Sequence, residues 1–371
     1  MKKKVCVDLP NSILSQRRKN YQSCFNKNSL YDKRYKLGIL GDESLRTIES
    51  EIHDYFTSLE KNEDFSGSVL ISKDEKVWFN RAYNFANREH QVKNTPETKF
   101  RIGSITKQFT AMAIMILQEH GQLDVADHVS KFIPSYKYGD HIKLHHLLTH
   151  SSGIPNITQL PDIKTLMKQP TTTEQIVRLI TDLEPQFDPN SKFQYSNSGY
   201  ILLAYIIEKT TGLTYEEFLS NQIFSPLGMK NSGCDNHKAI IPNRAQGYEY
   251  DNGIVNAEYI DMSFPMGGGN LYSTTEDLFK WDQSLYTERL VTRESLETIF
   301  TPHRFGYGYG WFIDVDQDRR KLFHGGGIVG FKNEIIRYVD DRITIILLNN
   351  LSTTNVEQIR NNLTTILFQK H

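Results

Sequence analysis

The hydrophobic pattern of the first third of the chain predicts two helices with a β-hairpin between them. Apolar residues recur every three or four positions between residues 43 and 60, which is typical of an amphipathic helix. Two short apolar runs follow, at 67–71 and 77–79, and the polar turn between them favours a hairpin. After Ser104 and up to about Gly121, apolar residues occupy nearly every side of the next predicted helix, so we expect that helix to be buried.

The remaining pattern predicts a helical middle region and a second group of strands. Residues 122–260 alternate helical patterns with long loops rich in Pro, Gly and Asn, and one clear helix is predicted at 200–211, ending at Gly212. Strand patterns return at 307–314, 321–324, 333–339 and 344–349, and a closing helix is predicted at about 355–369. The strands near both ends of the chain must then share one sheet.

This order of elements predicts an α/β (α+β) fold in which an antiparallel sheet is flanked by helices. We expect the sheet part at about 41–103 and 265–371, with a mostly helical part, about 104–264, inserted between its two halves. Residues 41–371 would then form one domain made of two parts rather than two consecutive domains.

The composition is that of a globular protein without a nucleic-acid partner. The 371 residues are 38% hydrophobic and 11% aromatic, which is too apolar for a disordered chain. The formal net charge is −1, and a charge so near zero argues against a dedicated nucleic-acid binder. The three cysteines, Cys6, Cys24 and Cys234, form neither a disulfide framework nor a C-x-x-C motif.

The charge is concentrated at one end of the chain. Residues 1–40 contain ten Lys or Arg and two acidic residues, a net charge of +8, which leaves −9 for the rest. We expect this basic segment to be a disordered tail, and contact with an anionic membrane surface is the alternative. No apolar stretch like that of a signal peptide follows Lys2, Lys3 and Lys4, and no uncharged run reaches the ~18 residues of a membrane span. The sequence therefore predicts a cytoplasmic protein without a transmembrane segment.

Two motifs suggest a dinucleotide or a metal site, but the residues around each motif argue against that interpretation. Residues 325–330 fit the G-x-G-x-x-G pattern of a dinucleotide site, but the residues after them predict a strand, where that site needs a helix. Four histidines, His141, His145, His146 and His150, stand at a helical spacing that could suit zinc. No Glu follows them in the H-E-x-x-H manner and leucines share the segment, so packing explains them better. We expect no metal and no cofactor.

The surviving candidate is a serine and a lysine at the start of the buried helix. Ser104 and Lys107 lie three residues apart, which places them one turn apart on the same face. A serine hydroxyl needs a base to become a nucleophile, and a lysine amine can be that base when burial and the positive end of the helix lower its pKa. The helix start also brings the Ser104 backbone N–H to where an oxyanion would form.

Two further motifs follow in order, and each of the three patterns also has a chance match elsewhere. Tyr195-Ser196-Asn197 precedes a predicted helix, and His324-Gly325-Gly326 ends a predicted strand. The chance matches are Ser58-x-x-Lys61, Tyr250-Asp251-Asn252 and Lys36-Leu37-Gly38. Order, spacing and context separate the three motifs from these duplicates.

Taken together, the motifs resemble those of the serine β-lactamase and penicillin-binding-protein superfamily, in particular its class C β-lactamase-like group. Three supporting stretches are similar to family landmarks: 147–154, 267–274 and 309–311. The similarity covers about residues 45–370. It implies a β-lactamase/transpeptidase-like fold and a serine hydrolase that works through an acyl-enzyme.

The resemblance also implies roles for the residues of the first two motifs. Ser104 would be the acylated nucleophile, Lys107 its proton acceptor, and Tyr195 the proton shuttle to the leaving group. Asn197 would hold a substrate amide or orient Lys107. Lys107 and Tyr195 would then titrate as a coupled pair.

The third motif contains the one departure from the resemblance. His324, Gly325 and Gly326 would line the opposite wall, and Gly327 would give the second N–H of an oxyanion hole. Cell-wall enzymes and β-lactamases of this group mostly have Lys where this chain has His324. A histidine is largely neutral at pH 7, which weakens the case for carboxylate recognition. Relatives with His at this place include esterases, D-amino-acid peptidases and amidases.

We therefore favour a serine hydrolase that acts on an ester or an amide, such as a D-amino-acid amide or peptide or a small acyl ester. A penicillin-binding protein with DD-carboxypeptidase or weak β-lactamase activity is the first alternative, and an extracytoplasmic location would favour it. A non-catalytic binding module on the same fold is the second. The expected partner is a small-molecule or short-peptide substrate, and the sequence leaves the oligomeric state open.

Overall fold

The computed structural model describes residues 42–316 and 318–368, and the predicted basic tail lies outside them. The chain divides into two compact units, residues 1–50 and 51–371. Helix α1 (Asp42–Lys61) crosses the boundary between the units. The sheet and the helical region both belong to the larger unit.

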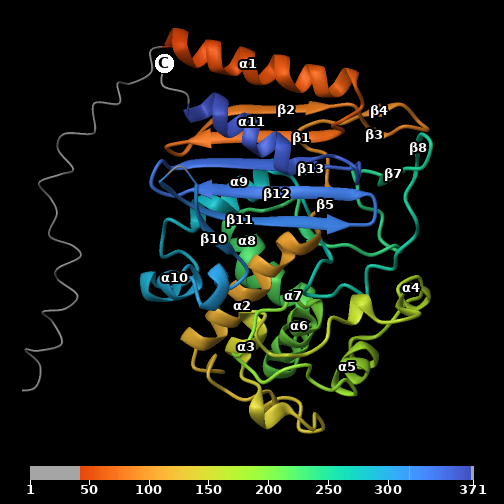
Figure 1. Cartoon of the computed structure of the whole chain (residues 1–371), viewed down its shortest axis with the longest axis vertical. Coiled ribbons are helices and arrows are strands. Elements are labelled where there is room, and N and C mark those ends of the chain that lie inside the picture. The colour runs from red at the N-terminus through yellow and green to blue at the C-terminus, as the bar shows by residue number, and fades with distance from the viewer. Residues whose placement is uncertain (1–41, 317, 369–371) are drawn as a thin grey trace, which may run out of the picture. The chain divides into compact units, whose positions relative to one another are not determined.

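The larger unit is built on a six-stranded antiparallel sheet in the order β10-β11-β12-β13-β1-β2 (Figure 1). Its strands are β1 (Gly67–Lys73), β2 (Lys76–Tyr83), β10 (Phe312–Asp316), β11 (Arg319–Ile328), β12 (Phe331–Tyr338) and β13 (Ile343–Asn349). In the pairing of β1 with β13, Gly67 lies opposite Asn349 and Lys73 lies opposite Ile343. The expectation that strands from both ends of the chain share one sheet is therefore confirmed.

The central strands are covered on both faces, which explains their apolar sequences. Every residue of β13, and all of β1 except Lys73, is buried. Helix α9 (Thr275–Ser284) packs against β1 and β13, and α11 (Val356–Phe368) packs against β12 on the opposite face (Figure 1). A strand buried on both faces has a continuous apolar run instead of strict alternation, as Ile345-Ile346-Leu347-Leu348 has in β13.

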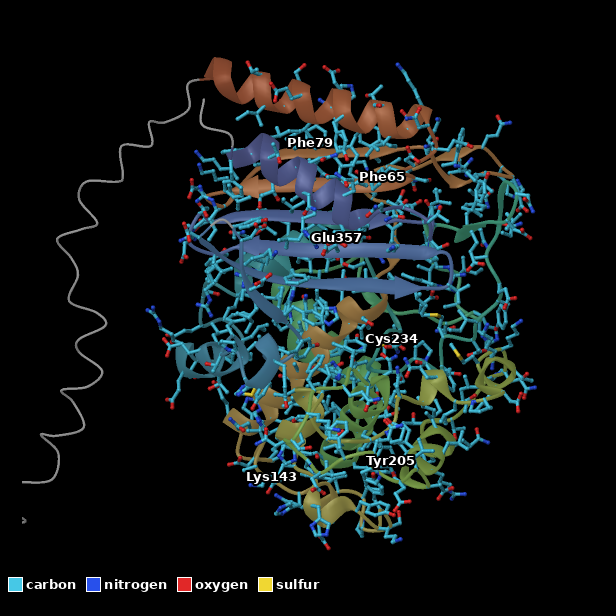
Figure 2. The ribbon with its side chains drawn as sticks, in the orientation of Figure 1. Phe65, Phe79, Lys143, Tyr205, Cys234 and Glu357 are labelled. Atoms are coloured by element: carbon cyan, nitrogen blue, oxygen red, sulfur yellow. The ribbon has the colours of Figure 1, made fainter. Side chains whose placement is uncertain are left out.

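A cluster of aromatic rings packs beside the β1–β2 hairpin. Phe56, in the part of α1 that belongs to the larger unit, is fully buried, and its ring centroid lies 5.0 Å from that of Phe65 and 5.3 Å from that of Tyr83. Phe79 of β2 lies 6.4 Å from the same ring (Figure 2). Aromatic rings bury large apolar areas, so this cluster anchors residues 51–61 on the hairpin.

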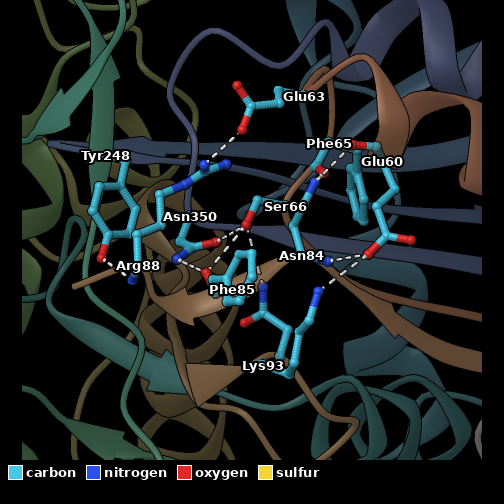
Figure 3. Close-up of polar contacts among 11 residues, drawn as sticks. Glu60, Glu63, Phe65, Ser66, Asn84, Phe85, Arg88, Lys93, Tyr248 and Asn350 are labelled. Carbon is cyan, nitrogen blue, oxygen red and sulfur yellow. Dashed lines mark hydrogen bonds and ion pairs between the residues drawn. The ribbon is translucent and has the colours of Figure 1, made fainter. Parts of the chain in front are cut away.

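A hydrogen-bonded network fixes the end of the sheet where β1 begins and β13 ends (Figure 3). The Ser66 hydroxyl donates to Asn350 Oδ1 at 2.9 Å, and Asn350 Nδ2 donates to the Phe85 carbonyl oxygen at 3.0 Å. Asn84 Nδ2 donates to the Phe65 carbonyl oxygen at 2.8 Å. Because a buried amide without a partner is costly, these bonds hold the loops around the sheet in one arrangement.

The region between the two halves of the sheet is mostly helical. It contains α2 (Thr106–Glu119), α3 (Leu144–Leu148), α4 (Ile163–Leu166), α5 (Thr173–Thr181), α6 (Asn197–Thr211), α7 (Tyr215–Leu219) and α8 (Ser225–Leu227). Helix α2 is buried from residue 106 to 117 and packs against α6 and α7, as its apolar circumference predicts. No helix in the described part of the chain is long and apolar enough to cross a membrane.

Short strands and one more helix complete the larger unit. β3 (Phe85–Asn87) pairs with β4 (Val92–Lys93), and β7 (Tyr248–Tyr250) pairs with β8 (Ile254–Asn256). β9 (Leu271–Ser273) lies between β5 (Phe100–Arg101) and β6 (Gly233–Cys234), and α10 (Arg293–Ile299) follows α9. The β5–β9 pair leads the chain directly to the start of α2.

The strand predicted at 307–314 begins later than its pattern suggests. β10 starts at Phe312, and Gly310 before it has a φ of +79°, in the left-handed region that favours glycine. A Cβ at Gly310 would lie 2.8 Å from the Lys107 carbonyl oxygen, so the chain passes closely over α2 before it enters the sheet. β11 is conversely longer than predicted, since Gly325, Gly326 and Gly327 continue its pairing with β12.

A buried ion pair between α9 and β12 gives a stability prediction. Arg337 Nε donates to Asp282 Oδ1, Thr344 Oγ1 donates to Asp282 Oδ2 at 2.8 Å, and the two charged side chains are 1% and 0% exposed. Asp282→Ala leaves the guanidinium buried without its anion, so we expect a loss of about 3–5 kcal/mol in unfolding free energy, measured by urea titration. The double variant Asp282→Leu/Arg337→Met should recover most of that loss. A double variant no more stable than Asp282→Ala would contradict this interpretation.

Candidate active site

A close approach of two backbone segments places Ser104 at the edge of the sheet. Ser104 lies in a 3₁₀ turn (Gly103–Ile105) that leads into α2, and Gly103 has a φ of +53°. A Cβ at Gly326 of β11 would lie 1.9 Å from the Ile102 carbonyl oxygen, and one at Gly103 would lie 2.9 Å from the Gly327 carbonyl oxygen. Only glycines permit this approach, and it brings Ser104 and Gly327 to the same cavity.

The amine of Lys107 lies among three oxygen atoms, one of which belongs to Ser104. Lys107 Nζ lies 3.0 Å from Ser104 Oγ, 2.8 Å from Asn197 Oδ1 and 2.7 Å from the Gly268 carbonyl oxygen. The last two oxygens can only accept hydrogen bonds. A neutral amine has two N–H groups, which these acceptors occupy, so its lone pair is left for the Ser104 hydroxyl proton. This arrangement suits proton transfer from Ser104 to Lys107.

Burial disfavours the charged form of that amine. The Lys107 side chain is 0% exposed, and burial lowers its pKa well below the usual 10.5. Its nitrogen lies 4.9 Å from the ring centroid of Tyr195 and 5.5 Å from that of Tyr200. Among the described residues, its hydrogen-bond partners include no carboxylate that would hold the proton on the amine.

Asn197 begins α6, and a chain of hydrogen bonds fixes the orientation of its amide. Asn197 Nδ2 donates to Thr158 Oγ1 at 3.2 Å, which leaves Oδ1 for Lys107. The Thr158 hydroxyl donates to Asn156 Oδ1 at 3.0 Å, and that oxygen also accepts the Asn197 backbone N–H at 3.1 Å. Asn156 and Thr158 are not among the residues predicted from the sequence. The only sequence signal for them is their position shortly after the 147–154 stretch.

Tyr195 lies on the irregular segment before α6, with its hydroxyl near Ser104. Burial raises the pKa of Tyr195, and a hydrogen bond with the Ser104 side chain opposes this shift. The Tyr195 phenol is therefore protonated at neutral pH, and it can donate this proton only if another group supplies a proton in return. The structure thus brings Ser104, Lys107, Tyr195 and Asn197 together.

His324 does not line the cavity beside Ser104. Its side chain is buried, and its Nδ1 lies 2.6 Å from the Gly325 carbonyl oxygen, which can only accept. Nδ1 therefore carries the proton, and Nε2 accepts from the Tyr307 hydroxyl at 3.0 Å. Burial, with a contribution from Lys107, lowers the pKa of His324 to about 3, so the ring is neutral. The cavity lining includes Gly327 but not His324, Gly325 or Gly326.

The cavity beside Ser104 has a volume of about 220 Å³ and is lined without charged side chains. Its polar side chains belong to Ser104, Thr158 and Asn197. Apolar residues supply most of the rest: Met167, Ile201, Ile260, Phe264, Pro265, Ile328 and Val329. A neutral, partly apolar group fits this surface better than an ion does.

The described residues contain no group of three or more His, Cys, Asp or Glu that could hold a metal ion. The histidines examined for zinc make other contacts: His145 Nδ1 bonds to the Tyr309 hydroxyl at 2.8 Å, and His146 Nδ1 accepts the Lys143 N–H at 3.1 Å. The chance match of Ser58 and Lys61 is exposed near the end of α1.

The lowered pKa of Lys107 predicts a pH-dependent stability. Between that lowered pKa and 10.5, the unfolded chain binds a proton on Lys107 that the folded chain does not bind, so stability rises with pH. Relative to Lys107→Met, the wild type should gain up to about 1.4 kcal/mol per pH unit between pH 7 and 9, measured by urea unfolding. A pH-independent difference would mean that Lys107 keeps an ordinary pKa.

Comparison with known proteins agrees with this fold and geometry. The family model described as Beta-lactamase matches residues 55–369. A penicillin-binding protein of Bacillus subtilis (strain 168) is 30% identical over 318 residues, which are 80% of this chain and 70% of that protein.

Solved structures give the same result. The octameric penicillin-binding protein homologue from Pyrococcus abyssi is 30% identical, with a TM-score of 0.77 over 87% of this chain and 78% of that one. The D-amino acid amidase from Ochrobactrum anthropi SV3 complexed with L-phenylalanine amide is 22% identical and shares the fold, with a TM-score of 0.76 over 87% of this chain and 98% of that one. The chain thus has the β-lactamase/transpeptidase-like fold, belongs to the Beta-lactamase family and is a serine hydrolase.

Proposed function

We propose that Ser104 is the acylated nucleophile of this hydrolase and that its substrates are esters or amides without a free carboxylate. The observation that carries the proposal is the buried Lys107 amine, whose nitrogen lies 3.0 Å from Ser104 Oγ, 2.8 Å from Asn197 Oδ1 and 2.7 Å from the Gly268 carbonyl oxygen. A neutral amine gives its two N–H groups to the two acceptor oxygens. Its lone pair is then the nearest base for the Ser104 proton.

The proposed reaction has two steps. Ser104 Oγ attacks the substrate carbonyl while its proton passes to Lys107. Tyr195 gives its own proton to the leaving alcohol or amine as the C–O or C–N bond breaks, and Lys107 returns a proton to Tyr195. A water molecule then attacks the acyl-enzyme while Lys107 takes its proton, and Tyr195 protonates Ser104 Oγ as the acyl bond to Ser104 breaks. Lys107 again reprotonates Tyr195, and the acid product leaves. The backbone N–H groups of Ser104 and Gly327 are the proposed oxyanion donors.

The cavity favours neutral substrates over free acids. A DD-carboxypeptidase would need a cation for the terminal carboxylate of its peptide, and the described lining of the cavity provides none. His324 does not supply this cation, because its lowered pKa of about 3 leaves the ring neutral and its side chain does not line the cavity. The amidase similarity supports D-amino-acid amides as one substrate class, and small acyl esters fit the same lining.

Covalent labelling tests the assignment of the nucleophile. The wild type should react with a fluorophosphonate reagent and gain its mass on Ser104, whereas Ser104→Ala should gain none and hydrolyse no ester. Lys107→Arg replaces the proposed neutral base by a permanent cation that cannot accept a proton, so it should lower hydrolysis by about 10²–10⁴-fold. Ser58→Ala, at the exposed chance match, is the matched control and should behave as wild type. Labelling that persists in Ser104→Ala would overturn the proposal.

The neutrality of His324 gives a second test. With a pKa of about 3, its ring stays uncharged from pH 5.5 to 8.5. The ratio of kcat/KM for a free-acid substrate to that for its methyl ester should therefore remain low and show no step attributable to His324. A ratio that rises as the pH falls through 6.5, the ordinary pKa of a histidine, would show that an imidazolium binds the substrate carboxylate.

A further inference from the structure

His150 holds both sides of the segment that carries Tyr195. This segment is neither helix nor strand, so no regular element fixes Tyr195. The His150 carbonyl oxygen accepts the Gln194 N–H at 2.9 Å, and His150 Nδ1 accepts the Ser196 N–H at 3.2 Å. The imidazole itself lies against Tyr195, with 4.3 Å between the ring centroids. Three contacts from one residue thus enclose Tyr195.

The protonation state of the His150 ring is compatible with these contacts to the Tyr195 segment. Because Nδ1 accepts a backbone N–H, the neutral ring carries its proton on Nε2, an atom that is buried and has no hydrogen-bond partner in the structure. Burial and the nearby Lys107 and His324 lower the pKa of His150 well below 6.5. The imidazole also contacts the rings of Tyr200 and Tyr307, at centroid distances of 5.1 and 4.8 Å.

The backbone at His150 is also specialised. Its φ is +54°, a left-handed conformation that few residues other than Gly, Asn, Asp and His adopt readily. This conformation follows α3 directly and turns the chain, so that the carbonyl and the side chain of the same residue both meet the Tyr195 segment.

We infer that His150 is a positioning residue that holds the Tyr195 hydroxyl at Ser104 for proton transfer to the leaving group. The inference rests on the proposed function of Tyr195. It predicts that loss of the His150 ring harms reactions in which the leaving group needs a proton more than reactions in which it does not. An aniline must be protonated as it leaves, whereas p-nitrophenolate leaves as a stable anion.

The test uses His150→Asn. Asn adopts a left-handed φ and places an acceptor near the position of Nδ1, so the Ser196 N–H keeps a partner while the ring against Tyr195 is lost. His146→Asn is the matched control, because His146 Nδ1 also accepts a backbone N–H, one turn earlier and away from Tyr195. The substrates are D-phenylalanine p-nitroanilide and p-nitrophenyl butyrate.

We expect His150→Asn to lower kcat for the anilide by about 10²-fold with little change in KM, and to affect the ester much less. In a Tyr195→Phe background the same change should have little further effect, because a residue that acts through Tyr195 has nothing left to position. His146→Asn should retain the wild-type rates. If His150→Asn does not fold, His150→Gly, which adopts the left-handed φ without strain and also removes the ring, takes its place in the same double-mutant cycle.

Equal losses on both substrates, or losses that multiply with Tyr195→Phe, would overturn the inference and assign His150 a purely structural role. Wild-type rates in His150→Asn would overturn it as well, while Ser104→Ala remains inactive and the proposed function stands. A wild-type protein that neither reacts with the fluorophosphonate nor hydrolyses either substrate would overturn the proposed function, and the inference with it.

Discussion

The arrangement around Ser104 depends on the burial of one lysine amine inside the protein. Lys107 is fully buried, and burial alone moves its pKa down. The groups around it satisfy a neutral amine without holding a proton on it: a backbone carbonyl at Gly268, an amide oxygen at Asn197, and the faces of two tyrosine rings. A carboxylate at this position would instead favour the charged form of the amine.

Glycines on three segments make that burial possible. Gly326 lies against the carbonyl of Ile102, Gly310 passes over the carbonyl of Lys107, and the Gly267 carbonyl oxygen accepts a hydrogen bond from Thr110 at 2.7 Å. The start of α2 is thereby enclosed by the sheet edge on one side and by loops on the other, without side chains that would hold them apart. The edge of the sheet fixes the position of the start of α2, and the side chains of Ser104, Lys107 and Asn197 come from the helical region.

Neutral imidazoles distinguish this site from one built around a permanent cation. His324 and His150 both lie near Tyr195, with ring centroids 6.2 and 4.3 Å from its own, and burial lowers the pKa of both. His150 Nδ1 accepts a backbone N–H, a bond that is lost if that nitrogen is protonated. A charged ring at either place would also repel a proton on the Lys107 amine.

The sequence by itself determined the elements whose pattern is local: the buried helix after Ser104, the strands of β12 and β13, and the three motifs in their order. It also located the four residues that the structure brings together at Ser104. Only the tertiary structure decided what depends on contacts between distant residues. The Gly268 carbonyl oxygen that contacts Lys107 is 161 positions away in the sequence. The Ser196 N–H that His150 accepts is 46 positions away. The lowered pKa values of Lys107 and His324 likewise follow from burial, which a single sequence does not encode position by position, because a pKa is set by everything that excludes water from the group.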